Sequence, residues 1–148
     1  MRTFYWAWSM ILFAAIIVQI GLAGFGAFYV VNKLGDEGST IDEDGFFEGF
    51  VFHAIWGYVV ILMGLVFLII GLVAGVGKWR LGRHGLLFLL FVLQFLLAFV
   101  GFELPFPGGF LHPINAFVIA SLCGWVVFDE WQLWRARRAA APVTPAPA

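Results

Sequence analysis

Four long apolar stretches constrain the fold of this chain more than any other feature. They cover roughly residues 4–31, 46–76, 85–102 and 111–134. About 20 helical residues, at about 1.5 Å each, cross a hydrocarbon layer about 30 Å thick, and each stretch reaches or approaches that length. Only 11% of the 148 residues are charged and 63% are hydrophobic, which leaves too little polar surface for a water-soluble domain. We therefore expect residues 1–138 to form an all-α domain, a bundle of four transmembrane helices.

The distribution of charge predicts the orientation of these helices. Acidic residues gather at one set of helix ends, and seven of the eight Lys and Arg residues gather at the other. The basic set is Arg2, Lys78, Arg80, Arg83, Arg135, Arg137 and Arg138. Because basic residues favour the cytoplasmic side, both termini are expected there, in a multi-pass protein of the bacterial inner membrane. The net charge of −1 gives no indication of nucleic-acid binding, so the expected surroundings are the lipid bilayer.

The two ends of the chain are expected to behave differently. The first apolar stretch is long and contains Gln19 in mid-span, so we interpret it as a retained helix and not as a cleaved signal peptide. Residues 139–148 form a Pro/Ala tail that has no means of burying itself, and we expect this tail to be disordered.

The second and fourth stretches contain two similar segments, FHAIWGYVV from Phe52 and LHPINAFVI from Leu111. The first and third stretches share Q-x-x-L-A-x-x-G, which begins at Gln19 in one and at Gln94 in the other. Two matches in tandem order predict the duplication of a two-helix hairpin, with the copies related by a pseudo-two-fold axis along the membrane normal. The expected connections are 32–45, 77–84 and 103–111.

The duplicated segments place a histidine at the same position of each copy, His53 and His112. An ionisable side chain inside a span costs a few kcal/mol unless it is paired, so it indicates a functional site. Two imidazoles that face each other across a pseudo-two-fold axis are suited to be the axial ligands of a haem iron. Glycines at the same level leave room for the porphyrin edge. The candidate site is thus haem b, with His53 and His112 as iron ligands and Gly26, Gly57, Gly101 and Asn115 around it.

Other interpretations of the polar residues remain open. Each histidine can instead tie helices together by bonding to a carbonyl group or to a glutamine, and Gln19 and Gln94 can act as such ties or contact a quinone. Zinc has less support, because it needs three or four protein ligands and the chain offers two histidines and scattered carboxylates. His84 lies between arginines and glycines, and we expect it to be a solvated boundary residue outside the site.

Two helix hairpins with a histidine near the start of the second and fourth helices resemble one half of haem A synthase. The resemblance covers roughly residues 4–134 and rests on topology, on histidines 59 residues apart and on glycine placement. The LHPINA segment is also similar to four-helix membrane proteins of actinobacterial type. Only one four-helix unit is present here, however, and Phe50 stands where the synthase has an acidic residue before its first histidine. Glu48 is five residues away, so the resemblance implies haem binding without haem hydroxylation.

The function expected from the sequence is that of a small b-type membrane cytochrome. It would pass electrons to or from a quinone or a respiratory partner, as an electron-transfer or accessory protein and not as a stand-alone enzyme. The resemblance to an eight-helix parent also implies a homodimer. The alternative is a structural or accessory subunit of a respiratory membrane complex that carries no cofactor.

Overall fold

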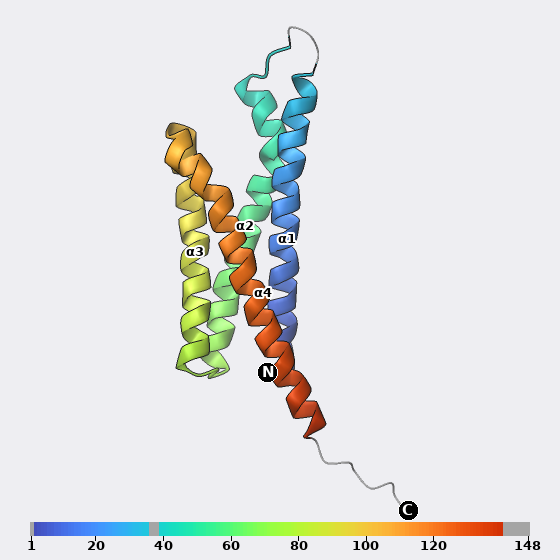
Figure 1. The fold of residues 1–148 in the computed structure, drawn as a ribbon, viewed down its shortest axis with the longest axis vertical. Coiled ribbons are helices and arrows are strands. Elements are labelled where there is room, and N and C mark those ends of the chain that lie inside the picture. The colour runs from blue at the N-terminus through green and yellow to red at the C-terminus, as the bar shows by residue number, and fades with distance from the viewer. Residues whose placement is uncertain (1, 36–38, 141–148) are drawn as a thin grey trace, which may run out of the picture.

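Four long helices and one short π-helical turn form the part of the chain that the computed structural model describes, residues 2–35 and 39–140 (Figure 1). The elements are α1 (Arg2–Lys33), α2 (Glu43–Val73), α3 (Lys78–Glu103), the turn η1 (Pro105–Gly109) and α4 (Phe110–Ala139). Each of the four helices is long and apolar enough to cross a membrane. The predicted all-α bundle of four membrane-spanning helices is confirmed.

The helices form two antiparallel hairpins, α1–α2 and α3–α4, packed side by side (Figure 1). The neighbouring pairs are α1 with α2, α1 with α4, α2 with α3, and α3 with α4. Within the described ranges, the backbones of α1 and α3 do not approach each other closely, and neither do those of α2 and α4, so these pairs meet only through side chains. The two helices that carry the histidine pair, α2 and α4, therefore lie on a diagonal of the bundle.

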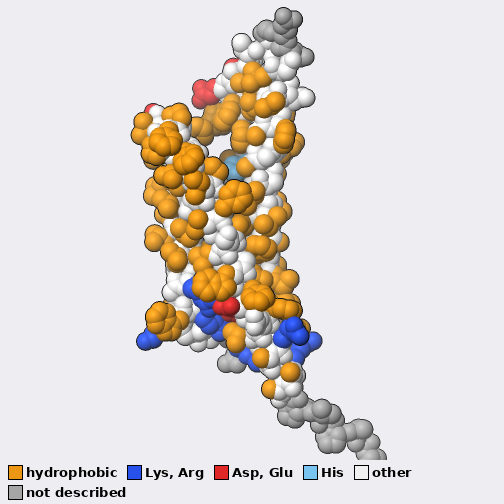
Figure 2. Space-filling view, in the orientation of Figure 1, with side chains coloured by type: hydrophobic (Ala, Val, Ile, Leu, Met, Phe, Trp, Pro, Cys, Tyr) orange, Lys and Arg blue, Asp and Glu red, His pale blue; other side chains and the backbone are white. Residues whose placement is uncertain are grey.

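The two ends of the bundle differ in charge, as Figure 2 shows. Lys and Arg side chains gather at one end, where α1 begins and α4 finishes, and we call this the basic end. We call the opposite end, where α1 and α3 finish, the acidic end. The described chain therefore begins and ends at the basic end (Figure 1), as expected for an even number of spans.

Large apolar side chains cover the outer surface along most of the length of the helices (Figure 2). Phe28 is 78% exposed and Phe117 is 64% exposed, and many Leu, Ile and Val side chains are similarly open. A surface of this kind is unfavourable in water, whereas lipid acyl chains match it. The exterior therefore supports a protein embedded in a bilayer through several spans.

The first helix boundary that differs from the prediction is the end of α2. The predicted span 46–76 is three residues too long, because α2 finishes at Val73. Gly75 and Gly77 follow with φ of 59° and 88°, a left-handed conformation that glycine adopts without steric cost and that cannot continue an α-helix. At its other end α2 begins at Glu43, where the Asp42 side chain accepts a hydrogen bond from the Gly45 N–H at 2.8 Å.

The start of α3 is the larger difference. Residues 78–84 were predicted to be part of a connection before a span over 85–102, and they are instead helical. The prediction was wrong because it began the helix where the apolar run begins and left the charged residues before it in a connection. Two of its arginines pair with carboxylates of α4: Arg80 with Glu130, and Arg83 with Asp129.

The C-terminal end of α4 also differs from the prediction. α4 extends to Ala139, so the first residue of the predicted Pro/Ala tail belongs to a helix. Residues 141–148 of that tail lie outside the described residues.

The predicted duplication extends to the interior of the bundle. A shift of 59 residues relates α2 to α4, and a shift of 75 residues relates α1 to α3. The following pairs are buried at both related positions: Val60 and Ile119, Gly64 and Cys123, Phe67 and Val126, Gly71 and Glu130, Ser9 and His84, Leu12 and Leu87, Ile16 and Phe91. Matching positions therefore face the same interior, which supports two copies of one hairpin.

Candidate functional site

The structure brings the two histidines of the repeat together. The ring centroids of His53 and His112 lie 6.3 Å apart, and the ring planes are inclined at 66°. Both side chains are partly buried and reach toward each other from α2 and α4, across the diagonal of the bundle. Figure 2 shows a hollow between the two hairpins toward the acidic end, with a histidine side chain at its floor.

A glutamine of the neighbouring helix holds each histidine. In the first hairpin, Nδ1 of His53 donates to the backbone carbonyl of Gln19 at 3.1 Å, and Nε2 of Gln19 donates to the backbone carbonyl of His53 at 3.0 Å. In the second, His112 and Gln94 make the same two bonds at 3.2 and 3.0 Å. Because a carbonyl oxygen only accepts, Nδ1 carries the proton in each neutral ring and Nε2 keeps a lone pair.

A third hydrogen bond repeats in the two hairpins, although the residues that make it differ. Nε1 of Trp56 donates to the carbonyl of Ala15 at 2.9 Å, and Nδ2 of Asn115 donates to the carbonyl of Leu90 at 3.0 Å. The sequence did not reveal this equivalence, because tryptophan and asparagine are unlike in type. Its one signal was position, since each residue stands three places after the histidine.

The three predicted glycines allow close contacts inside each hairpin. A Cβ added to Gly26 would lie 2.9 Å from the carbonyl oxygen of Gly49, and one added to Gly101 would lie 2.9 Å from the amide nitrogen of Gly109. A Cβ on Gly57 would lie 3.2 Å from Nε2 of Gln19. The glycines thus permit the approach of α1 to α2 and of α3 to η1. That they also border a cofactor stays a prediction.

Aromatic side chains bound the site around α2. On the α1 side, Phe50 packs over Gly26 and meets the ring of His53 edge-on at a centroid distance of 6.3 Å. Contacts between the hairpins lie on either side of the histidines along α2: Phe46 with Phe102 at 6.5 Å, and Tyr58 with Phe95 at 5.1 Å. The room at this level is therefore on the side of α1 and α4, where Figure 2 shows the hollow.

The donor set is two imidazoles. Among the described residues, no three His, Cys, Asp or Glu side chains are grouped closely enough to hold a metal ion. An ion at this place would need a carrier that supplies its remaining ligands, as a porphyrin does. Two metal–imidazole bonds of about 2 Å, with each ring centre about 1.1 Å beyond its nitrogen, give roughly 6 Å between ring centres. The observed separation of 6.3 Å is close to this value, while Nε2 of His53 lies 3.3 Å from the Gln19 amide of its own hairpin.

The prediction for His84 was wrong. This histidine is 1% exposed and lies inside the basic end of the bundle, and is not a solvated boundary residue. Its Nδ1 donates to the carbonyl of Arg80, its Nε2 accepts from the hydroxyl of Tyr5, and its ring packs on Phe67 at 4.4 Å. Gly71 of α2 lies against the ring. His84 precedes Gln94 by ten residues, about 15 Å along the helix, so it is not part of the histidine pair.

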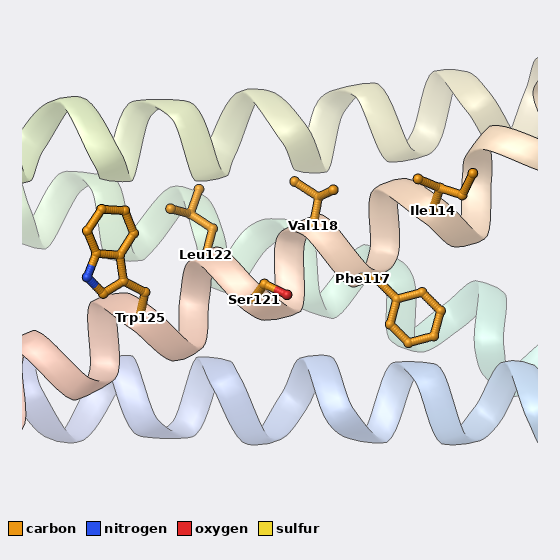
Figure 3. Close-up of a pocket in the computed structure, with 6 residues that line it drawn as sticks. All are labelled: Ile114, Phe117, Val118, Ser121, Leu122 and Trp125. Carbon is orange, nitrogen blue, oxygen red and sulfur yellow. The ribbon is translucent and has the colours of Figure 1, made fainter.

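A separate shallow groove of about 500 Å³ lies on the outward face of α4 (Figure 3). Its lining is apolar apart from one serine: Ile114, Phe117, Val118, Ser121, Leu122 and Trp125. These side chains belong to a single helix and contain no group suited to metal binding or proton transfer. We therefore interpret the groove as part of the lipid-facing surface.

The histidine pair, its glutamine ties and the adjoining hollow form the candidate functional site. They come from all four helices and are repeated in both hairpins. No protein-family model, curated protein or solved structure matches the chain.

Proposed function

We propose that this protein is a small b-type membrane cytochrome that holds one haem between His53 and His112. The observation that carries the proposal is the facing pair of imidazoles, 6.3 Å apart, each with Nδ1 bonded to a backbone carbonyl. Histidines that bind metals commonly donate their second ring nitrogen to such an acceptor, which fixes the tautomer and the direction of the ring. The hollow beside the pair supports the proposal, because a flat apolar group needs space there.

Haem, when bound, supplies a centre that accepts and releases one electron. The residues of the chain have other tasks. The carbonyls of Gln19 and Gln94 accept from Nδ1 of the two imidazoles, which fixes the tautomer of each ring and leaves the lone pair on Nε2. Phe46 and Phe102 meet between α2 and α3, and Phe50 lies between the ring of His53 and Gly26 of α1. A quinone or a respiratory partner would exchange electrons from the side of the hollow.

The absorbance spectrum of the purified protein, produced with ample haem, tests this proposal. We expect a Soret band with the visible bands of a low-spin haem ligated by two histidines. The double variant His53→Ala, His112→Ala should lose the band. The matched control replaces the third histidine, His84→Gln, and should keep it, since His84 lies about 15 Å away. A colourless wild-type protein, or a double variant with an unchanged spectrum, would refute the proposal.

A second function has a specific observation in its favour. The reciprocal bonds of Gln19 with His53 and of Gln94 with His112 already give each histidine a structural task. The protein would then be an accessory subunit whose polar residues tie the helices of each hairpin. This alternative predicts a colourless protein in which His53→Gln and His112→Gln alter thermal stability equally and change nothing else.

A further inference from the structure

The two histidines are held alike at Nδ1 but differ at Nε2, the nitrogen that would bind a metal. In the first hairpin, Nε2 of Gln19 lies 3.3 Å from Nε2 of His53, in addition to its bond with the His53 carbonyl. In the second, Nε2 of Gln94 reaches the His112 carbonyl alone. Over residues 2–35 and 39–140, no hydrogen bond reaches Nε2 of His112. The lone pair of one imidazole is thus shared with an amide, and that of the other is free.

The difference follows from one break in the repeat, Trp56 opposite Asn115. Asn115 donates to Oε1 of Gln94 at 2.7 Å as well as to a backbone carbonyl, so both ends of the Gln94 amide have a partner. The indole of Trp56 has a single N–H, which is used by the carbonyl of Ala15. Oε1 of Gln19 is consequently buried without a hydrogen-bond partner in the described part of the chain. The Gln19 amide is therefore held less firmly and can serve the ring of His53.

We propose that His112 is the permanent axial ligand and His53 the exchangeable one, and that a neutral diatomic gas such as carbon monoxide binds at the position His53 leaves. This inference rests on the proposed haem site. A neutral imidazole with its proton on Nδ1 has one lone pair, at Nε2, so the metal and the Gln19 amide compete for it. Were haem bound, His53 would be the ligand that gives way to such a gas, because the Gln19 amide can supply its Nε2 with a hydrogen bond in place of the metal. No electron or proton is transferred.

The geometry also gives the incoming gas a defined neighbour. The Gln19 amide and its unpartnered Oε1 lie beside His53, next to the position that opens. On the other face, Asn115 keeps the Gln94 amide turned away from the ring of His112. A gas binding site is accordingly expected on the α1–α2 side of the haem and not on the α3–α4 side.

The two single-histidine variants, studied as purified and reduced protein loaded with haem, test the assignment. We expect His53→Ala to retain haem, in a five-coordinate high-spin form that binds carbon monoxide rapidly. We expect His112→Ala to retain at least about tenfold less haem per chain, because the ligand that remains is the one in competition with an amide. Equal retention by the two variants, or better retention by His112→Ala, would overturn the inference.

A pair of glutamine variants separates the ring contact from the helix tie. Gln19→Met and Gln94→Met both remove an amide bond to a backbone carbonyl, but only Gln19→Met removes a contact with an imidazole nitrogen. Since a hydrogen bond of this kind shifts an equilibrium several-fold, Gln19→Met should slow carbon monoxide binding by about fivefold relative to Gln94→Met. A larger slowing in Gln94→Met would place the exchange at His112.

Nitrogen-15 NMR of the haem-free protein gives a readout that does not depend on haem. The resonance of His53 Nε2 should be shifted to lower frequency, because this nitrogen accepts a hydrogen bond from Gln19. The resonance of His112 Nε2 should not be shifted. Gln19→Met should bring the two resonances together. A colourless wild type with this NMR difference would refute the haem site but not the asymmetry. A haem protein whose two resonances coincide would refute the asymmetry alone.

Discussion

The two ends of the bundle are held together by different kinds of contact. At the basic end, Tyr5 of α1 donates a hydrogen bond to His84 of α3, and Trp6 stacks on Trp134 of α4 at 5.1 Å. Both contacts join one hairpin to the other. Around the histidine pair toward the acidic end, every side-chain hydrogen bond of the described residues stays within a hairpin, and the contacts between hairpins are aromatic.

This difference shows which part of the molecule fixes the fold and which part is left to function. In the described ranges, the bond between Tyr5 and His84 is the one side-chain hydrogen bond that connects the hairpins. It spans the α1–α3 diagonal at one end, whereas His53 and His112 face each other across the α2–α4 diagonal nearer the other. A group bound by both imidazoles would supply the second connection between the hairpins. The proposed haem would therefore stabilise the end that the protein alone leaves open.

The largest effect is expected at the basic end, from loss of the carboxylate that pairs with Arg80. Glu130 is 5% exposed and sits against Arg80 inside the bundle. Glu130→Ala leaves the partly buried guanidinium of Arg80 without its partner, which we expect to cost about 3 kcal/mol of stability, the lower end of the range for a fully buried pair. Thermal unfolding in detergent, followed by circular dichroism, measures the loss.

The neighbouring ion pair provides the control for that prediction. Asp129 pairs with Arg83, but both side chains are more exposed than Glu130, at 32% and 24%. Asp129→Ala should accordingly cost about 1 kcal/mol or less. If the two alanine variants unfold at the same temperature, the more buried Glu130 pair contributes no more to the stability of the basic end than the exposed pair does, and the prediction is wrong.

A smaller loss is expected within the first hairpin, near the acidic end. The side chain of Gly26→Ala would collide with the Gly49 carbonyl, which belongs to the backbone and cannot turn aside. We expect about 1–3 kcal/mol of destabilisation, as for other overpacked interiors, together with displacement of α2 and its histidine. Gly24→Ala, two residues away, meets no atom within 4 Å and should be neutral. Unfolding in detergent compares the pair, and equal stability would show that α1 and α2 do not depend on this close approach.

The sequence predicted the features that depend on hydrophobicity and repetition. Apolar runs of sufficient length predicted the four helices, because a chain in lipid must satisfy its backbone hydrogen bonds internally. The repeat predicted that His53 and His112 would occupy corresponding places, and the structure brings their rings to 6.3 Å. The glutamine ties were foreseen as one of two roles for Gln19 and Gln94. Their reciprocal bonds with the histidines needed coordinates.

The features that could not be predicted depend on partners distant in the chain. The charged start of α3 was taken for a connection, because hydropathy does not reveal that Arg80 and Arg83 meet carboxylates about 50 residues later. The burial of His84 was missed for the same reason, since its partner Tyr5 lies 79 residues earlier. Likewise, no local pattern indicates that Trp56 and Asn115 both donate to a backbone carbonyl of the neighbouring helix. Nor does one indicate that only Asn115 also bonds to the adjoining glutamine.

The smallest expected effect tests the connection between the hairpins most directly. Tyr5→Phe keeps the ring that stacks on Phe67 at 5.2 Å but removes the hydroxyl that serves His84, and it leaves a buried ring nitrogen unsatisfied. We expect a loss of about 1–2 kcal/mol in the haem-free protein, measured by unfolding in detergent. Tyr29→Phe removes an exposed hydroxyl at the acidic end, bonded to Glu48 within one hairpin, and should change stability by less than about 0.5 kcal/mol. If Tyr29→Phe costs as much as Tyr5→Phe, the bond between the hairpins stabilises the protein no more than an exposed bond within one hairpin. The difference between the two ends would then be due to aromatic packing and ion pairs alone.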